Sequence, residues 1–125
     1  MKYFTASELK CQCAVVGCTK HGMDKDFMNM IDGIREEAGF PFPVNSGYRC
    51  PKHPIEAKKE NGPGAHATGK AIDIAVNGEQ ALVLVALAMK HEIYRIGVNQ
   101  KGSYESRFIH LDVCENYMTP ALWSY

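Results

Sequence analysis

Two histidines and two aspartates have the types and spacing of a catalytic metal site. His66 lies on a loop just before an apolar strand that carries Asp73, and a second strand-like segment carries His110 and Asp112. Imidazole nitrogens and carboxylate oxygens both bind zinc, at about 2.0–2.2 Å. Burying the carboxylate of Asp73 among its apolar neighbours would be costly without a cation or a hydrogen-bond partner. We therefore predict that His66, Asp73 and His110 bind zinc and leave a fourth position open for catalysis.

Asp112 is the carboxylate that follows the last of these ligands most closely. Residues i and i+2 of a strand share one face, so the side chains of His110 and Asp112 should lie on the same side of the sheet. Two roles follow for Asp112. It is either the general base that takes a proton from water, or the residue that orients His110 through a hydrogen bond. Glu105 and Glu115 are the alternatives for the base.

The predicted ligands need a sheet to bring them together. Asp24 is a typical helix N-cap, and Gly39 ends the helix that follows it. A second helix has a nearly continuous apolar surface and should be well buried. The expected helices cover residues 24–39 and 79–92, and the expected strands cover 43–46, 69–76, 94–98 and 107–113. We predict an α+β fold in which a small, mainly antiparallel sheet packs against two helices.

The length of 125 residues predicts one domain, 1–125, whose first 22 residues form a cysteine-bearing N-terminal segment. Cys11, Cys13, Cys18 and His21 lie in this segment and could form a second, structural zinc site. The alternative is a set of reduced thiols or one disulfide. The total of five cysteines is odd, so at least one is unpaired within a monomer.

The composition excludes several classes of partner. The formal net charge is zero, whereas a nucleic-acid-binding protein would normally carry a basic excess. The longest apolar run is far shorter than a membrane span. The N-terminus lacks the apolar core of a signal peptide, so we expect synthesis and folding in the cytoplasm unless another route exports the protein. We expect a monomer.

Three blocks of the sequence, in this order, resemble the M15 peptidases. They are Ser46-Gly-Tyr-Arg-Cys-Pro51, His66-Ala-Thr-Gly-Lys-Ala-Ile-Asp-Ile74 and Phe108-Ile-His-Leu-Asp-Val113. The closing Leu122-Trp-Ser-Tyr125 is similar to the end of many short phage-type members. A histidine alone is more often a surface or hydrogen-bonded residue than a ligand. The combination of blocks is what makes the resemblance specific.

The resemblance implies a zinc-dependent peptidase that hydrolyses stem or cross-link peptides of peptidoglycan, as a D-Ala-D-Ala carboxypeptidase or as an endopeptidase of the phage endolysin type. Such an enzyme acts on the cell wall, which is the host's if the protein comes from a bacteriophage. The resemblance also implies that Arg49 holds a carboxylate or carbonyl of the substrate, a role that suits the guanidinium fork. The alternative for Arg49 is a structural ion pair.

The sequence departs from the family pattern in two places. Ala65 stands where many members have a serine, and Phe108 and Arg107 occupy the positions of the general base in several branches. This departure keeps a second function open. Hedgehog-type domains have a similar zinc site, so the chain could be a non-catalytic, zinc-containing module that binds cell wall or protein. The motifs do not distinguish which peptide bond would be cut, nor a phage from a bacterial source.

Overall fold

The computed structural model describes residues 2–10, 22–48, 65–115 and 117–125. Its helices are α1 (Ala6–Leu9), α2 (Lys25–Ala38) and α4 (Gly78–Lys90), and two 3₁₀ turns are η1 (Ala65–Thr68) and η2 (Tyr104–Ser106). The strands are β1 (Val44–Ser46), β2 (Ala71–Ile74), β3 (Arg95–Asn99), β4 (Phe108–Asp112) and β5 (Ala121–Ser124).

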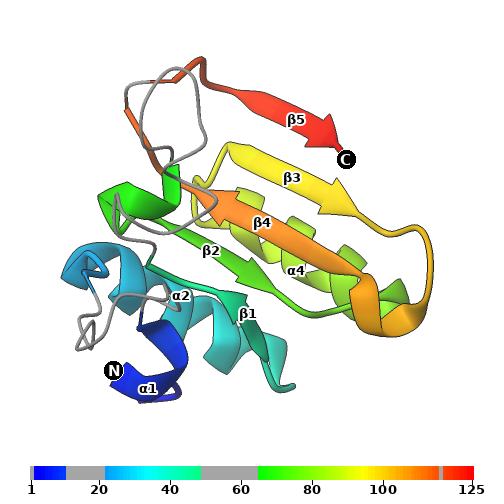
Figure 1. Ribbon diagram of the computed structural model, residues 1–125, viewed down its shortest axis with the longest axis horizontal. Helices are drawn as coiled ribbons and strands as arrows, with labels where there is room; N and C mark the ends of the chain where they lie inside the picture. The colour runs from blue at the N-terminus through cyan, green and yellow to red at the C-terminus, as the bar shows by residue number, and fades with distance from the viewer. Residues whose placement is uncertain (1, 11–21, 49–64, 116) are drawn as a thin grey trace, which may run out of the picture.

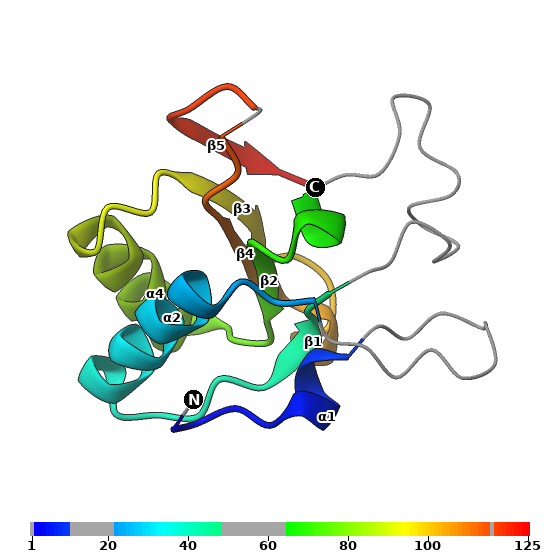
Figure 2. The same ribbon diagram turned by 90° about the vertical axis from the view of Figure 1, so that its left-hand side faces the viewer.

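The five strands form one sheet in the order β1-β2-β4-β3-β5 (Figure 1). The first four are antiparallel to their neighbours, and β5 runs parallel to β3 along the edge. Helices α2 and α4 lie together against one face of this sheet (Figure 2). The prediction of an α+β fold with a mainly antiparallel sheet and two packed helices is confirmed.

The hydrophobic core fills the space between the sheet and the two helices. Alternate residues of β2 and β4 point into it, because successive side chains of a strand face opposite ways. They meet the buried stripes of α2 and α4, and the central members of this cluster are Ile31, Ile34, Ile72, Ile74, Leu84, Ile109 and Leu111. The residues between them, Asp73, His110 and Asp112, therefore point to the face of the sheet that carries no long helix.

Both ends of α2 are those predicted from the sequence. A side-chain oxygen of Asp24 accepts a hydrogen bond from the backbone nitrogen of Phe27 at 2.9 Å, which caps the first turn. Gly39 ends the helix in the left-handed conformation, with φ 75°, which glycine adopts without strain. The helix is therefore fixed by local sequence signals as well as by packing.

The prediction that α4 is well buried is wrong for its outer surface. Only Ala81, Leu84 and Ala88 are buried, whereas Leu82 and Met89 expose 74% and 53% of their surface. The reason is geometric, since a helix that covers one face of a sheet buries one stripe of side chains. The described part of the chain contains no helix with the length and hydrophobicity to cross a bilayer.

Candidate metal centre

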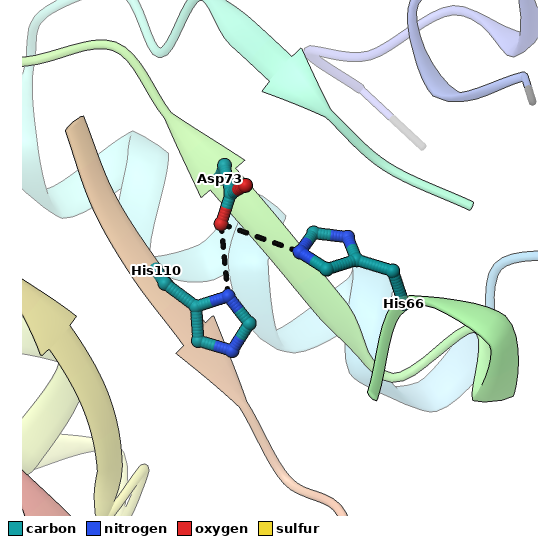
Figure 3. Close-up of side chains that lie close together, drawn as sticks. All are labelled: His66, Asp73 and His110. Carbon is teal, nitrogen blue, oxygen red and sulfur yellow. Dashed lines mark hydrogen bonds and ion pairs between the residues drawn. The ribbon is translucent and has the colours of Figure 1, made fainter. Parts of the chain in front are cut away.

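Three buried polar side chains converge on the face of the sheet opposite α2 and α4. His66 comes from η1, Asp73 from β2 and His110 from β4 (Figure 3). Asp73 Oδ1 lies 2.8 Å from His110 Nδ1 and 3.3 Å from His66 Nε2. One nitrogen or oxygen from each residue lies within 4.8 Å of the others, which is close enough for a shared metal ion.

Strand register explains how residues far apart in the sequence meet here. Asp73 and His110 are direct partners in the antiparallel β2–β4 pair, so their side chains stand next to each other. The next residue in the same row is Gly97 of β3, which pairs with His110. His66 reaches the row from η1, which leads into β2 through Gly69 in a left-handed conformation with φ 78°.

Hydrogen bonds on the far side of each ring select the nitrogen that faces Asp73. His66 Nδ1 donates to the backbone carbonyl of Gly47 at 2.7 Å, so its Nε2 is directed toward Asp73. His110 Nε2 donates to Asp112 Oδ2 at 2.7 Å, so its Nδ1 is directed toward Asp73. Such partners fix the tautomer and orientation of metal-binding histidines. Two oriented imidazole nitrogens and one carboxylate oxygen are a donor set that fits zinc.

Asp112 is fully buried and has hydrogen bonds on both carboxylate oxygens. Its Oδ2 accepts from His110, as described above, and its Oδ1 accepts from Arg95 Nε at 2.7 Å and from the backbone nitrogen of Cys114 at 3.1 Å. The carboxylate is therefore held rigidly next to the ring of His110. This arrangement suits a residue that orients a ligand.

The two aspartates on either side of His110 control its protonation. Burial acts to lower the pKa of His110, but its hydrogen bonds with Asp112 and Asp73 outweigh burial and raise that pKa above the ordinary value. Burial acts to raise the pKa of Asp73, but the hydrogen bonds from His110 and His66 hold it well below its usual range. The site without metal thus favours a proton on His110, and a metal at the same atoms would replace that proton.

The remaining predicted residues are placed as follows. Arg49 lies outside the described residues, as do Cys11, Cys13, Cys18, His21 and Cys50. Glu105 is exposed on η2, which precedes the end of β4 farthest from Asp112. Glu115 is also exposed, and it lines a hollow of about 500 Å³ together with Asp112, Arg95, Tyr94 and Tyr117. Glu105 does not line this hollow.

Three contributors to the site were not predicted from the sequence. Gly47 acts through its carbonyl oxygen, although its place in the Ser-Gly-Tyr-Arg block was a signal that could have drawn attention to it. Arg95 holds Asp112, and nothing in the local sequence of β3 marks it. The ring of Trp123 lies 5.3 Å from the ring of His110, measured between centroids.

The chain was compared with models of known protein families. The model of the family described as Peptidase M15 matches residues 2–112. This range includes His66, Asp73, His110 and Asp112, and it ends before β5. Searches of the curated proteins and of the solved structures gave no match.

Proposed function

Because the chain belongs to the Peptidase M15 family, we propose that it is a zinc-dependent peptidase that hydrolyses stem or cross-link peptides of peptidoglycan. Family membership makes the protein a hydrolase of peptide bonds. The observation that carries the rest of the proposal is the convergence of His66 Nε2, Asp73 Oδ1 and His110 Nδ1, each turned toward one point by its neighbours. The site of action that follows from such a substrate is the cell wall.

The three converging atoms are the ones that would hold the metal. Bound zinc supplies Lewis acidity, which activates water and polarises a carbonyl group. The protein's own contribution is to keep the two histidines in defined tautomers and to bury Asp73 between them. Three protein ligands leave room for a substrate or water position, as in catalytic rather than structural zinc sites.

Asp112 supports this centre best as the residue that orients His110. A general base must have a lone pair directed at the proton that it removes. The oxygens of Asp112 instead accept from His110, Arg95 and the backbone of Cys114, and the side chain is fully buried. Of the alternatives for the base we favour Glu115, which is exposed and lines a hollow together with Asp112; none of the three metal-binding residues lines that hollow. Arg49 keeps its proposed role of holding a substrate carboxylate or carbonyl.

The engagement of Asp112 also favours a second candidate, a zinc-containing module that binds cell wall or protein without cutting it. Such a module needs the oriented ligands but no base. The two candidates agree on zinc binding and differ in the fate of a bound peptide, so a product assay separates them.

The deciding experiment incubates zinc-loaded protein with purified muropeptides and identifies products by mass spectrometry. Release of D-alanine indicates a carboxypeptidase, and two peptide fragments indicate an endopeptidase. The reaction should stop with a chelator and resume with added zinc. The matched control is His91→Ala, since His91 contacts Glu37 on the opposite, helical side and should be dispensable. If zinc is bound but the muropeptides stay intact in every sample, the non-catalytic binding module becomes the better hypothesis.

A further inference from the structure

The C-terminal strand reaches the metal centre although it lies beyond the family match. Residues 113–125 follow the matched range, 2–112. In the structure, β5 pairs with β3 and places Trp123 opposite Gly97, which is itself the partner of His110. The ring of Trp123 lies beside that of His110. A segment outside the matched region therefore forms one wall of the candidate site.

Gly97 makes room for this wall. A β-carbon on Gly97 would lie 2.6 Å from Trp123 Nε1 and 2.9 Å from Tyr125 Oη, which is closer than real β-carbon contacts allow. Glycine at position 97 therefore lets the tryptophan ring approach the backbone of β3 beside His110. The close approach shows that the position of Trp123 is determined by packing.

Arg95 connects the same C-terminal segment to Asp112. Its Nε donates to Asp112 Oδ1 at 2.7 Å, and its Nη1 donates to the carbonyl oxygen of Met118 at 2.5 Å. Its guanidinium carbon lies 5.0 Å from the centre of the Tyr117 ring and 5.1 Å from that of Trp123. Guanidinium groups interact favourably with aromatic rings at such distances. Arg95 is thus held by three residues of the C-terminal segment.

We propose that Arg95 is a positioning residue of the metal centre, held by the C-terminal segment so that Asp112 keeps His110 in its metal-binding tautomer. Without Arg95, Oδ1 of Asp112 would keep only the longer hydrogen bond from the backbone nitrogen of Cys114, at 3.1 Å, and the carboxylate would be held less firmly. His110 Nε2 would then lose a fixed acceptor. The proposal rests on the proposed function only in that the site binds zinc.

The test compares Arg95→Met and Arg95→Lys with a matched control, Arg107→Met. Arg107 also lies over a tyrosine ring, that of Tyr104, and donates to a backbone carbonyl, that of Gly102, but it has no described contact with the site. Zinc affinity is measured by competition with a chromophoric chelator. Residues that hydrogen-bond to metal ligands typically contribute about 10–100-fold to metal affinity. Arg95 is one hydrogen bond further from the metal than Asp112. We therefore expect Arg95→Met to lower zinc affinity by about 10-fold.

A spectroscopic readout separates positioning from general destabilisation. In the wild-type protein, the proton on His110 Nε2 should give a slowly exchanging, strongly downfield NMR signal, because it is buried and donates to a carboxylate. This signal should broaden or move upfield in Arg95→Met and persist in Arg107→Met. Arg95→Lys, which keeps one donor, should retain part of both the signal and the affinity. If Arg95→Met does not fold, the comparison of Arg95→Lys with wild type decides by the same criteria.

A double-mutant cycle shows whether Arg95 acts through Asp112. In an Asp112→Asn background, Arg95→Met should cause little further loss of zinc affinity, since coupled residues are not additive. Additive losses would overturn the proposal, and so would an Arg95→Met protein with the affinity and NMR signal of the Arg107→Met control. These readouts do not use hydrolysis. A protein that needs Arg95 for tight zinc binding but cuts no muropeptide would refute the proposed peptidase activity and leave this inference standing.

Discussion

His110 and Asp112 lie two residues apart on β4 and are joined by a hydrogen bond of 2.7 Å from Nε2 of the ring to Oδ2 of the carboxylate. This bond decides which ring nitrogen faces Asp73. The same bond also engages the carboxylate of Asp112, which the sequence analysis gave as a possible general base. The pair therefore links the two open questions of the site, how tightly metal is held and which group accepts the proton.

The Asp112→Asn substitution distinguishes these roles. Asparagine keeps the size of the side chain but is a weaker acceptor for His110 and for Arg95. We expect zinc affinity to fall by roughly 10–100-fold, with peptidase activity recovered at saturating zinc. Zinc titrations followed by hydrolysis assays at each zinc concentration make the measurement. Full zinc affinity with activity reduced by roughly 10²–10⁴-fold would instead identify Asp112 as the base.

Metal content should depend on the two histidines of the cluster. Elemental analysis of the purified protein should find about one zinc per chain, or about two if Cys11, Cys13, Cys18 and His21 form a second site. His66→Ala and His110→Ala should each remove one equivalent and abolish hydrolysis. His91→Ala should retain both metal and activity. A His110→Ala protein that keeps chelator-sensitive activity would exclude the proposed ligand set.

Arg49→Lys tests the proposed contact with substrate. Lysine keeps the charge but lacks the planar fork, so a bidentate contact with a carboxylate would be lost. We expect kcat/KM to fall by the equivalent of about 1.5–3 kcal/mol, with zinc content unchanged. Arg35→Lys is the control, because Arg35 lies on α2 against the ring of Tyr3, on the face of the sheet opposite the metal centre. Equal kinetics for the Arg49 and Arg35 variants would favour a structural role for Arg49.

The stability of the metal-free protein should have a maximum in mildly acidic solution. The pKa of Asp73 and that of Asp112 are lowered on folding, so their contribution is present above about pH 4 and is lost as pH falls further. The pKa of His110 is raised on folding, so its contribution is present below about pH 6.5 and is lost as pH rises through the raised value. Urea unfolding in the presence of chelator, repeated across pH 3–9, measures this curve. A His110→Gln protein should lose the decline on the alkaline side.

Gly97→Ala tests the packing of the C-terminal strand. The added methyl group would collide with Trp123, which is the only tryptophan of the chain. We expect a loss of about 1–3 kcal/mol in the free energy of unfolding, as for other overpacked positions, together with a changed tryptophan fluorescence spectrum. Gly33→Ala on α2 is the matched control. Its nearest neighbour would be a carbon of His91 at 4.0 Å, so the substitution should leave the fluorescence unchanged.

The parts of the fold that the sequence predicted are those with local signals. The caps Asp24 and Gly39 predicted both ends of α2, and strands were expected in the two segments that form β2 and β4. The meeting of Asp73 with His110 required these two strands to be neighbours, and the register shows that they are. Their binding of zinc stays a prediction.

The parts that could not be predicted depend on contacts between distant segments. The pairing of β5 with β3 is parallel and joins residues that lie 26 positions apart, such as Gly97 and Trp123. The four residues of β5 are too few for a periodicity that would predict its pairing with β3. The role of Arg95 could not be predicted from its own strand, because it depends on contacts with Asp112 of β4 and Trp123 of β5. The role of Gly47 depends on a backbone carbonyl, and every residue type has one.

The register of β2 and β4 gives the metal a use in studies of folding. Asp73 and His110 are 37 positions apart and become neighbours only when these two central strands pair. Tight zinc capture should therefore begin when the middle of the sheet forms. In a stopped-flow refolding experiment with a fluorescent zinc indicator, the rate at which free zinc disappears would report the rate at which these two strands pair. Far-UV circular dichroism, in contrast, reports the formation of all helices and strands together.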